Sequence, residues 1–211
     1  NHADDQVTYR TSWYDQNGLK IDPGEIHSLA QDLDGDLWVG TNEGLFLIPS
    51  TVDFATSDRC ERVIIPRNDG TQLADYLLDK EKITSIVVDG ANRKWIGTAN
   101  AGVFLLSEDG LETIEHFTAE NSPLLNNTIL SIAILETTGE VFIGTGEGLM
   151  SYMSDALPAE DDFTNIYAYP NPVLPNYKGE VVIKGLMADT QVRILDANGN
   201  LVKVLTGLGG E

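Results

Sequence analysis

The sequence predicts an all-β fold, in which short antiparallel strands form a series of small sheets along the 211 residues. Two observations carry this prediction. A unit of three apolar strands occurs three times, and its second strand always ends in Gly-Thr, at positions 40–41, 97–98 and 144–145. Beyond residue 163, segments of alternating polar and apolar residues are separated by prolines and an Asn-Gly turn, a pattern typical of a small β-sandwich.

The repeated unit opens with Ile-x-Ser followed by Ile or Leu, at residues 26–29, 83–86 and 129–132. Its second strand reads Leu-Trp-Val, Lys-Trp-Ile or Val-Phe-Ile before Gly-Thr, and its third strand begins with Gly-Leu or Gly-Val. The Gly-Thr pairs lie 57 and then 47 residues apart, so the second spacing suits a four-stranded unit and the first contains an insertion. Short apolar runs of Ile, Val, Trp and Phe between turns predict buried strands.

A turn sequence separates the first two strands of each unit, at Asp34-Gly35, Asp89-Gly90 and Thr138-Gly139. A tight hairpin turn needs positive φ, which glycine adopts without steric cost. We therefore expect each of these glycines to close a β-hairpin. Segments at 62–65 and 111–117 predict a fourth strand in units one and two. Four antiparallel strands that repeat radially form a β-propeller.

Three regions are expected: residues 1–155 as the C-terminal blades of a β-propeller, residues 156–162 as an acidic linker, and residues 163–211 as a truncated β-sandwich. About three blades cannot close a ring that needs about four to eight. We therefore expect a larger ring, in which residues 7–14 are the outer strand of a blade whose other strands precede residue 1. An open stack of blades also exposes an apolar edge, which favours self-association.

Composition excludes several classes of protein. Acidic residues outnumber basic residues 33 to 13, and the net charge is −20, so the chain repels phosphate backbones and no nucleic-acid partner is expected. The apolar runs are short, as at 129–135, whereas a membrane-spanning helix needs about 20 residues. No transmembrane segment is expected. A single cysteine, Cys60, excludes an intrachain disulfide and a cysteine-based metal cluster.

Residues 32–36, Asp-Leu-Asp-Gly-Asp, together with Glu43 imitate the spacing of a calcium loop. An EF-hand loop has glycine at its sixth position, where this chain has Leu37, and lies between helices rather than strands. Units two and three keep the turn without these carboxylates. We therefore interpret residues 32–36 as a hairpin turn and assign no metal ligand.

The aromatic residues Trp38, Trp95 and Phe142 recur at one position of the unit. They could stack against sugar rings, but residues in the middle of a buried strand are expected to pack between blades.

The loops after Gly-Thr contain the candidate rim residues Asn42, Glu43, Asn100 and Glu147. Equivalent loops of a propeller gather at one mouth of its central channel, where a ligand or partner protein could bind. The alternative is an acidic surface that contacts only solvent.

No catalytic or cofactor-binding residue is assigned. A glycosidase needs two carboxylates at a set separation, and with 33 acidic residues any such pair is uninformative. The histidines His2, His27 and His116 have no spacing of a metal site or a catalytic triad. Nothing near Cys60 in the sequence lowers its pKa, so an inert thiol is expected.

The three units resemble the two-component-regulator propeller repeat, with its pattern Ile-x-Ser-Ile, Asp-x-x-Gly-x-Leu-Trp-Ile-Gly-Thr, Gly-Leu. The resemblance covers about residues 13–153. Unit three departs from it at Phe142 and at Thr-Gly-Glu 138–140. Such repeats build sensor ectodomains of hybrid histidine kinases and secreted proteins of Bacteroidetes-type bacteria.

The segment from Tyr167, which contains Tyr-Pro-Asn-Pro, resembles the immunoglobulin-like C-terminal domain associated with the type IX (Por) secretion system. That domain usually continues with a Trp-Asp-Gly turn and closing strands, which this sequence lacks. We therefore expect an incomplete immunoglobulin-like sandwich.

Together these resemblances imply a non-enzymatic binding or scaffold protein of the type IX attachment complex, without a cofactor. It would be secreted to the periplasm or outer surface of a Gram-negative bacterium. The implied partners are other envelope proteins of the complex and anionic lipopolysaccharide or a glycan. The alternative is a periplasmic sensory ectodomain of a hybrid two-component system that binds a glycan. A third class, a polysaccharide-degrading propeller enzyme, has no constellation of residues to support it.

Overall fold

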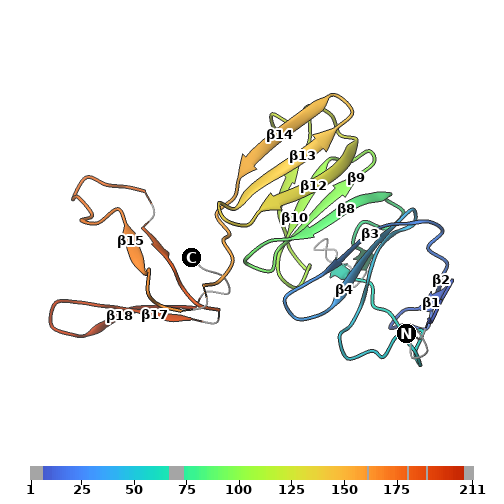
Figure 1. Cartoon of the computed structure of the whole chain (residues 1–211), viewed down its shortest axis with the longest axis horizontal. Helices are drawn as coiled ribbons and strands as arrows, with labels where there is room; N and C mark the ends of the chain where they lie inside the picture. The colour runs from blue at the N-terminus through green and yellow to red at the C-terminus, as the bar shows by residue number, and fades with distance from the viewer. Residues whose placement is uncertain (1–6, 67–73, 161, 180, 189, 207–211) are drawn as a thin grey trace, which may run out of the picture.

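The computed structural model describes residues 7–66, 74–160, 162–179, 181–188 and 190–206, and the regular structure of these residues is β-strand throughout. Three of its antiparallel sheets correspond to the three sequence units and stack side by side (Figure 1). We name them blade one, blade two and blade three. The predicted all-β fold with part of a propeller is confirmed. Within the described residues, no helix is long and apolar enough to cross a membrane.

The strands of each blade follow one another in sequence order. Blade one consists of β3 (Ile26–Gln31), β4 (Leu37–Thr41) and β5 (Gly44–Ile48). Blade two consists of β8 (Ile83–Val88), β9 (Lys94–Thr98), β10 (Val103–Leu106) and β11 (Thr113–Phe117). Blade three consists of β12 (Ile129–Leu135), β13 (Glu140–Thr145) and β14 (Gly148–Met153). Each neighbouring pair is antiparallel, as the predicted hairpins require.

The predicted fourth strand is confirmed in blade two and wrong in blade one. In blade two, β11 pairs with β10. In the first unit, however, β6 (Ile64–Pro66) pairs with β7 (Ala74–Tyr76) in a separate sheet. Among the described residues of this segment, only the single bridge Leu47–Glu61, with N···O distances of 2.9 and 2.8 Å, reaches β5. The reason is that the insertion supplies its own partner strand, so the apolar run leaves the blade after one bridge.

The predicted strand at residues 7–14 is shorter than expected. Only β1 (Trp13–Tyr14) is a strand, and it pairs with β2 (Lys20–Ile21). Trp13 is buried and packs on Phe46 of blade one, with the ring centroids 5.3 Å apart. This short hairpin therefore covers the outer strands of blade one.

Adjacent blades are joined by the same hydrogen bond at both interfaces. The Ser28 hydroxyl accepts a bond of 2.8 Å from the Ile86 N–H, and the Ser85 hydroxyl accepts one of 2.9 Å from the Ile132 N–H. The serine of the Ile-x-Ser motif thus contacts the same motif of the next blade.

A close approach of a glycine and an isoleucine accompanies each of these bonds. A Cβ atom at Gly40 would lie 2.6 Å from Cγ2 of Ile83, and a Cβ atom at Gly97 would lie 2.7 Å from Cγ2 of Ile129. The glycine of each Gly-Thr pair therefore provides the space into which the next blade packs.

Two of the three recurring aromatic residues, Trp38 and Trp95, pack between blades, as predicted. The Trp38 and Trp95 side chains are 2% and 0% exposed and belong to the two largest apolar clusters, which lie at the two blade interfaces. Phe142, at the outer face of blade three, is half-buried.

The first turn of blade two differs from the prediction. Gly35 and Gly139 have positive φ, of 86° and 70°, but in blade two the residue with positive φ is Asn92, at 58°. Gly90 lies two residues earlier in its turn. Asparagine tolerates this conformation better than most residues, because its short polar side chain forms local hydrogen bonds.

The C-terminal region contains two separate antiparallel hairpins, which Figure 1 shows to one side of the blades. They are formed by β15 (Tyr167–Tyr169) with β16 (Val182–Lys184), and β17 (Gln191–Leu195) with β18 (Leu201–Thr206). All residues of β18 are exposed. The division at residues 156–162 and the immunoglobulin-like sandwich for 163–211 therefore stay predictions.

Candidate functional site

The turn that joins the first two strands of a blade is built around an aspartate. Asp32 Oδ1 accepts hydrogen bonds from the N–H groups of Asp34, at 3.1 Å, and Asp36, at 2.9 Å. Asp89 Oδ1 accepts from the N–H groups two and four residues further on, both at 3.0 Å. Such bonds stabilise a turn by satisfying backbone donors.

The second oxygen of each aspartate binds the tryptophan of the following strand. Trp38 Nε1 donates to Asp32 Oδ2 at 2.8 Å, and Trp95 Nε1 donates to Asp89 Oδ2 at 3.1 Å. The aspartate and the tryptophan of the repeat therefore act as a pair, because a buried indole N–H needs an acceptor.

A buried ion pair joins blade one to blade two. Lys94 Nζ of β9 lies 3.1 Å from Asp32 Oδ2, and the two side chains are 0% and 3% exposed. Burial alone would raise the pKa of Asp32, but the Trp38 hydrogen bond and the Lys94 ammonium outweigh burial and hold the pKa below its ordinary value of 3.8. Asp32 is therefore ionised and has a structural role between the blades.

Asp32 is expected to make the protein sensitive to acid. Because its pKa is lower in the folded than in the unfolded chain, its contribution to stability is complete above a pH of about 4 and is lost as the pH falls through the folded value. Thermal unfolding between about pH 7 and about pH 2 measures this loss. The variant Asp32→Asn should lose less stability over that range than the parent protein, and equal losses would contradict this role.

The three aspartates of residues 32–36 all accept hydrogen bonds. Asp34 Oδ2 accepts from Asn92 Nδ2 at 2.8 Å, and Asp36 Oδ1 accepts from the Ser50 N–H at 2.7 Å. Across the described part of the chain, no group of three or more His, Cys, Asp or Glu side chains is arranged to hold a metal ion. The interpretation of residues 32–36 as a hairpin turn is confirmed by the pairing of β3 with β4.

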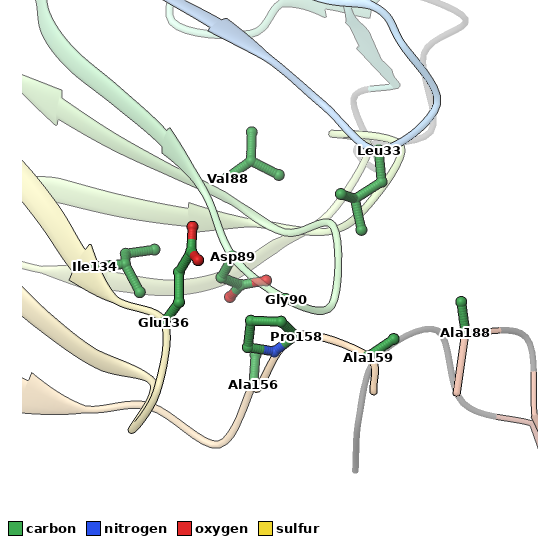
Figure 2. Close-up of a pocket in the computed structure, with 10 residues that line it drawn as sticks. All are labelled: Leu33, Val88, Asp89, Gly90, Ile134, Glu136, Ala156, Pro158, Ala159 and Ala188. Carbon is green, nitrogen blue, oxygen red and sulfur yellow. The ribbon is translucent and has the colours of Figure 1, made fainter. Parts of the chain in front are cut away.

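A cavity of about 420 Å³ lies where the first turns of all three blades meet the chain that follows blade three (Figure 2). Leu33 enters it from blade one, Gly90 from blade two and Glu136 from blade three. Pro158 and Ala188 come from the C-terminal side. The remaining lining residues are Val88, Asp89, Ile134, Ala156 and Ala159. Most of this surface is apolar, which suits an apolar group of a ligand or of a protein partner.

Glu136 stands where the other two blades have Asp32 and Asp89. Blade three has Phe142 in place of tryptophan, so this position lacks an indole N–H donor. The Glu136 side chain is exposed, and no described residue forms a hydrogen bond or ion pair with it. The cavity therefore has a carboxylate that is available to a partner. The sequence shows that unit three lacks both the aspartate and the tryptophan of the other units. It does not show that Glu136 lies beside an apolar cavity.

Residues 154–160 lie against the turns of blades two and three. Arg93 Nη2 donates to Ser154 Oγ at 2.8 Å and lies 2.8 Å from Asp155 Oδ1. The Glu160 N–H donates to the Leu186 carbonyl at 2.9 Å, which ties this segment to the C-terminal region. The start of the predicted acidic linker thus packs on the blades and forms one wall of the cavity.

Gly90→Ala is expected to displace this segment. A Cβ atom at residue 90 would lie 2.1 Å from the Leu157 carbonyl carbon, which is a backbone atom and cannot rotate away. Digestion with a protease that cuts after glutamate should therefore cleave at Glu160 several-fold faster, as followed by mass spectrometry. Gly146→Ala is the control, because a Cβ atom there meets nothing within 4 Å. Equal cleavage rates in the two variants would contradict the packing role.

The predicted rim residues lie at the opposite end of the strands from this cavity. In each blade the turn at Asp32, Asp89 or Glu136 precedes the second strand, whereas the loop with the rim residue follows it. The structure therefore does not bring the rim and the cavity together. Whether the rim binds a partner stays a prediction.

Two of the rim residues are bonded to their own blade. Asn42 Oδ1 lies 2.7 Å from His27 Nε2, and Glu147 Oε1 accepts from Asn126 Nδ2 at 2.9 Å. Asn100 is exposed. Glu43 lies beside a second cavity, of about 200 Å³, which Lys20, Arg62 and Lys80 also line.

The other singled-out side chains have structural contacts. His116 stacks on Phe104, with ring centroids 3.9 Å apart, and its Nε2 lies 2.6 Å from the Ala101 carbonyl oxygen. His2 lies outside the described residues. Cys60 is 1% exposed, and burial raises the pKa of its thiol to about 12. The thiol is therefore protonated and shielded, in agreement with the predicted inert cysteine.

Residues 20–43, from β2 to the loop after β4, match the family model of the two-component regulator propeller. None of the curated proteins matches the chain.

The structure is similar to that of PorZ, an essential bacterial surface component of the type IX secretion system of Porphyromonas gingivalis. The TM-score is 0.69 and the identity 33%, over 100% of this chain and 28% of PorZ. The chain thus spans little more than a quarter of the length of PorZ. The resemblance to the propeller proteins of that secretion system, stated above from sequence motifs, is confirmed.

Two extracellular domains from B. thetaiotaomicron, both from proteins described as hybrid two-component systems, are more distantly similar. One has a TM-score of 0.43 and 15% identity, and the match covers 90% of this chain and 27% of the chain of that domain. The other has a TM-score of 0.37 and 20% identity, and the match covers 74% of this chain and 26% of the chain of that domain. At these values neither domain carries an inference about this chain.

Proposed function

We propose that this chain is the section of a non-enzymatic bacterial surface protein whose blades bind other proteins of a type IX secretion system. The similarity to PorZ over the whole chain, at 33% identity, carries this proposal. Its place would be the periplasm or the outer surface of a Gram-negative bacterium. The protein partners, and anionic lipopolysaccharide or another glycan as a further ligand, belong to the same proposal.

We name the surface around the cavity, where the first turns of the three blades meet, the turn face. It is the surface that we propose for the protein partner. Its cavity combines an apolar lining, which includes Leu33 and Pro158, with the unengaged carboxylate of Glu136. An apolar side chain next to a basic group would satisfy both features. The rim residues Asn42, Glu43, Asn100 and Glu147 are the second proposed surface, at the other end of the strands.

A chimera tests the proposed function. The segment of P. gingivalis PorZ that is similar to this chain would be replaced with residues 1–211, and export through the type IX system would be compared with parent PorZ and with a deletion of that segment. We expect the chimera to restore export well above the deletion. A chimera that reaches the surface in a protease-resistant form and exports no more than the deletion would contradict the proposal.

Two variants of the chimera distinguish the two surfaces. Leu33→Asp changes an exposed residue of the turn face, and Asn100→Lys changes the rim. Leu111→Asp is the control, because Leu111 is also exposed, does not line the cavity and is not one of the rim residues. Loss of export with Leu33→Asp alone would support the turn face, and loss with Asn100→Lys alone would support the rim.

A sensory ectodomain that binds a glycan is the alternative, and the match of residues 20–43 to the two-component regulator propeller favours it. Calorimetric titration with oligosaccharides would show saturable binding in that case. Binding of a glycan together with failure of the chimera would replace the proposed function with this one.

A further inference from the structure

Two turns of the chain share the pattern Asp-x-Asn-Gly, at residues 15–18 and 196–199. In each, the glycine N–H donates to the aspartate carbonyl, at 2.9 Å in the first turn and 3.0 Å in the second. The aspartate Oδ1 accepts from the N–H groups two and four residues further on, at 2.9 and 2.8 Å in the first turn and at 2.8 Å in the second. The glycines have φ of 76° and 87°, and a Cβ atom on either would meet nothing within 4 Å. The two Asn-Gly pairs therefore have the same local geometry.

An Asn-Gly pair carries its own chemistry, because glycine has no side chain to hinder attack by its backbone nitrogen. The glycine nitrogen gives its proton to water or hydroxide and forms a bond to the asparagine Cγ. The bond from Cγ to Nδ2 breaks, and Nδ2 takes up a proton and leaves as ammonia. Water then opens the five-membered imide at either carbonyl, which yields aspartate or isoaspartate.

The first turn is docked on the segment that contains β6 and β7. Asn17 Nδ2 donates to Tyr76 Oη at 3.2 Å, and the Tyr76 hydroxyl donates to Asp15 Oδ2, also at 3.2 Å. Gln16 Nε2 donates to the Arg62 carbonyl at 2.7 Å, and Gln16 Oε1 accepts from the Arg62 N–H at 3.0 Å. Imide formation would turn the Asn17 side chain back onto its own backbone. It would therefore break the bond to Tyr76 and disturb the docked turn.

The second turn has no such support in the described part of the chain. Asp196 Oδ2 accepts from Asn200 Nδ2, at 2.9 Å, which lies within the turn itself. Asn198 is exposed, and no described residue forms a hydrogen bond with its side chain. Ala197 stands where the first turn has Gln16, and it has no polar group that could anchor the turn. The Asn198 amide is therefore free to rotate toward the nitrogen of the following glycine.

We propose that Asn198 is a site of spontaneous deamidation in the folded protein, and that the contacts of the first turn protect Asn17 from the same reaction. The product has a carboxylate beside Asp196, and its isoaspartate form also adds a methylene group to the backbone between β17 and β18. Each event makes the net charge of −20 more negative by one, so ion exchange separates the modified chain from the parent chain. This inference goes beyond the proposed function.

The test follows both sites in one sample. The whole chain is kept folded at mildly alkaline pH and then digested with trypsin, which releases residues 11–20 and 194–203, each with one Asn-Gly pair. Mass spectrometry measures the gain of one mass unit, and isoaspartyl methyltransferase labels the isoaspartate product. We expect deamidation at Asn198 to be several-fold faster than at Asn17. In concentrated urea the two rates should become similar, because the contacts of the first turn are lost.

Two variants test the protection of Asn17. Tyr76→Phe keeps the ring that lies under the Arg62 guanidinium and removes the hydroxyl, and Gln16→Ala removes both bonds to the Arg62 backbone. Each should speed deamidation at Asn17 and leave Asn198 unchanged. Asn198→Gln is the control, because it keeps an amide on a side chain that is too long to form the five-membered imide. Its peptide 194–203 should keep its mass.

Three results would overturn the proposal. Equal rates at the two sites of the folded chain would show that the contacts to Tyr76 and Arg62 do not matter. An unchanged rate at Asn17 in both variants would assign its protection to another cause. A gain of mass at Asn198 without isoaspartate would exclude the imide. None of these measurements involves secretion, so they are distinguishable from failure of the chimera.

Discussion

Replacing Lys94 with alanine is expected to lower the free energy of unfolding by about 3–5 kcal/mol, because it leaves a buried carboxylate without its cation. The Lys94 and Asp32 side chains are almost completely buried, with Nζ and Oδ2 3.1 Å apart. Lys94 also donates to the Glu108 carbonyl and lies 5.0 Å from the centre of the Trp38 ring. Urea unfolding followed by tryptophan fluorescence measures the loss.

Two further variants separate the ion pair from other effects of the substitution. Lys20→Ala removes a lysine from the exposed pair Lys20–Asp22, which has an N···O distance of 2.8 Å, and should change stability little, because solvent screens the pair. The double variant Asp32→Asn/Lys94→Ala should be more stable than the sum of the two single losses predicts, because the unpaired charge is gone. Additive losses would contradict the coupling between blades one and two.

Gly40→Ala is expected to destabilise the protein by about 1–3 kcal/mol, because the added methyl group enters a filled interface. Its Cβ atom would lie 2.6 Å from Cγ2 and 3.0 Å from Cβ of Ile83. Ile83 is fully buried between blades one and two, so it has little room to move. The blades would have to separate slightly, and the melting temperature should fall.

Gly144→Ala is the matched control, because it makes the same change at the equivalent position of blade three. Its Cβ atom would meet only Ser131, whose nearest atom is a hydroxyl oxygen that can rotate. A small change in melting temperature for Gly144→Ala beside a large one for Gly40→Ala is the expected result. Equal decreases would contradict a role for the packing of Ile83, because the lower entropy of the unfolded chain by itself makes Gly→Ala stabilising.

The candidate site could be predicted from the sequence only in part. The aspartate and tryptophan of the repeat are visible as a pattern. In unit three this pattern is broken, because Glu136 replaces the aspartate and Phe142 replaces the tryptophan. The predicted rim lies at the other end of the strands from the cavity beside Glu136. The cavity itself depends on Pro158 and Ala188, which follow the repeats and carry no motif. Its position is a consequence of how the chain packs after blade three.

The blades could be predicted from the repeated units, because their strands and turns are local and recur with the same residues. Ser28 and Gly40 are recognisable as a motif, and the same motif supplies the contact to the next blade. Three features became visible only in the folded chain: the pairing of β6 with β7, the positive φ of Asn92 and the ion pair of Asp32 with Lys94. Each of these depends on competition between distant segments for one partner or one space, and a local pattern of residues does not record the outcome of that competition.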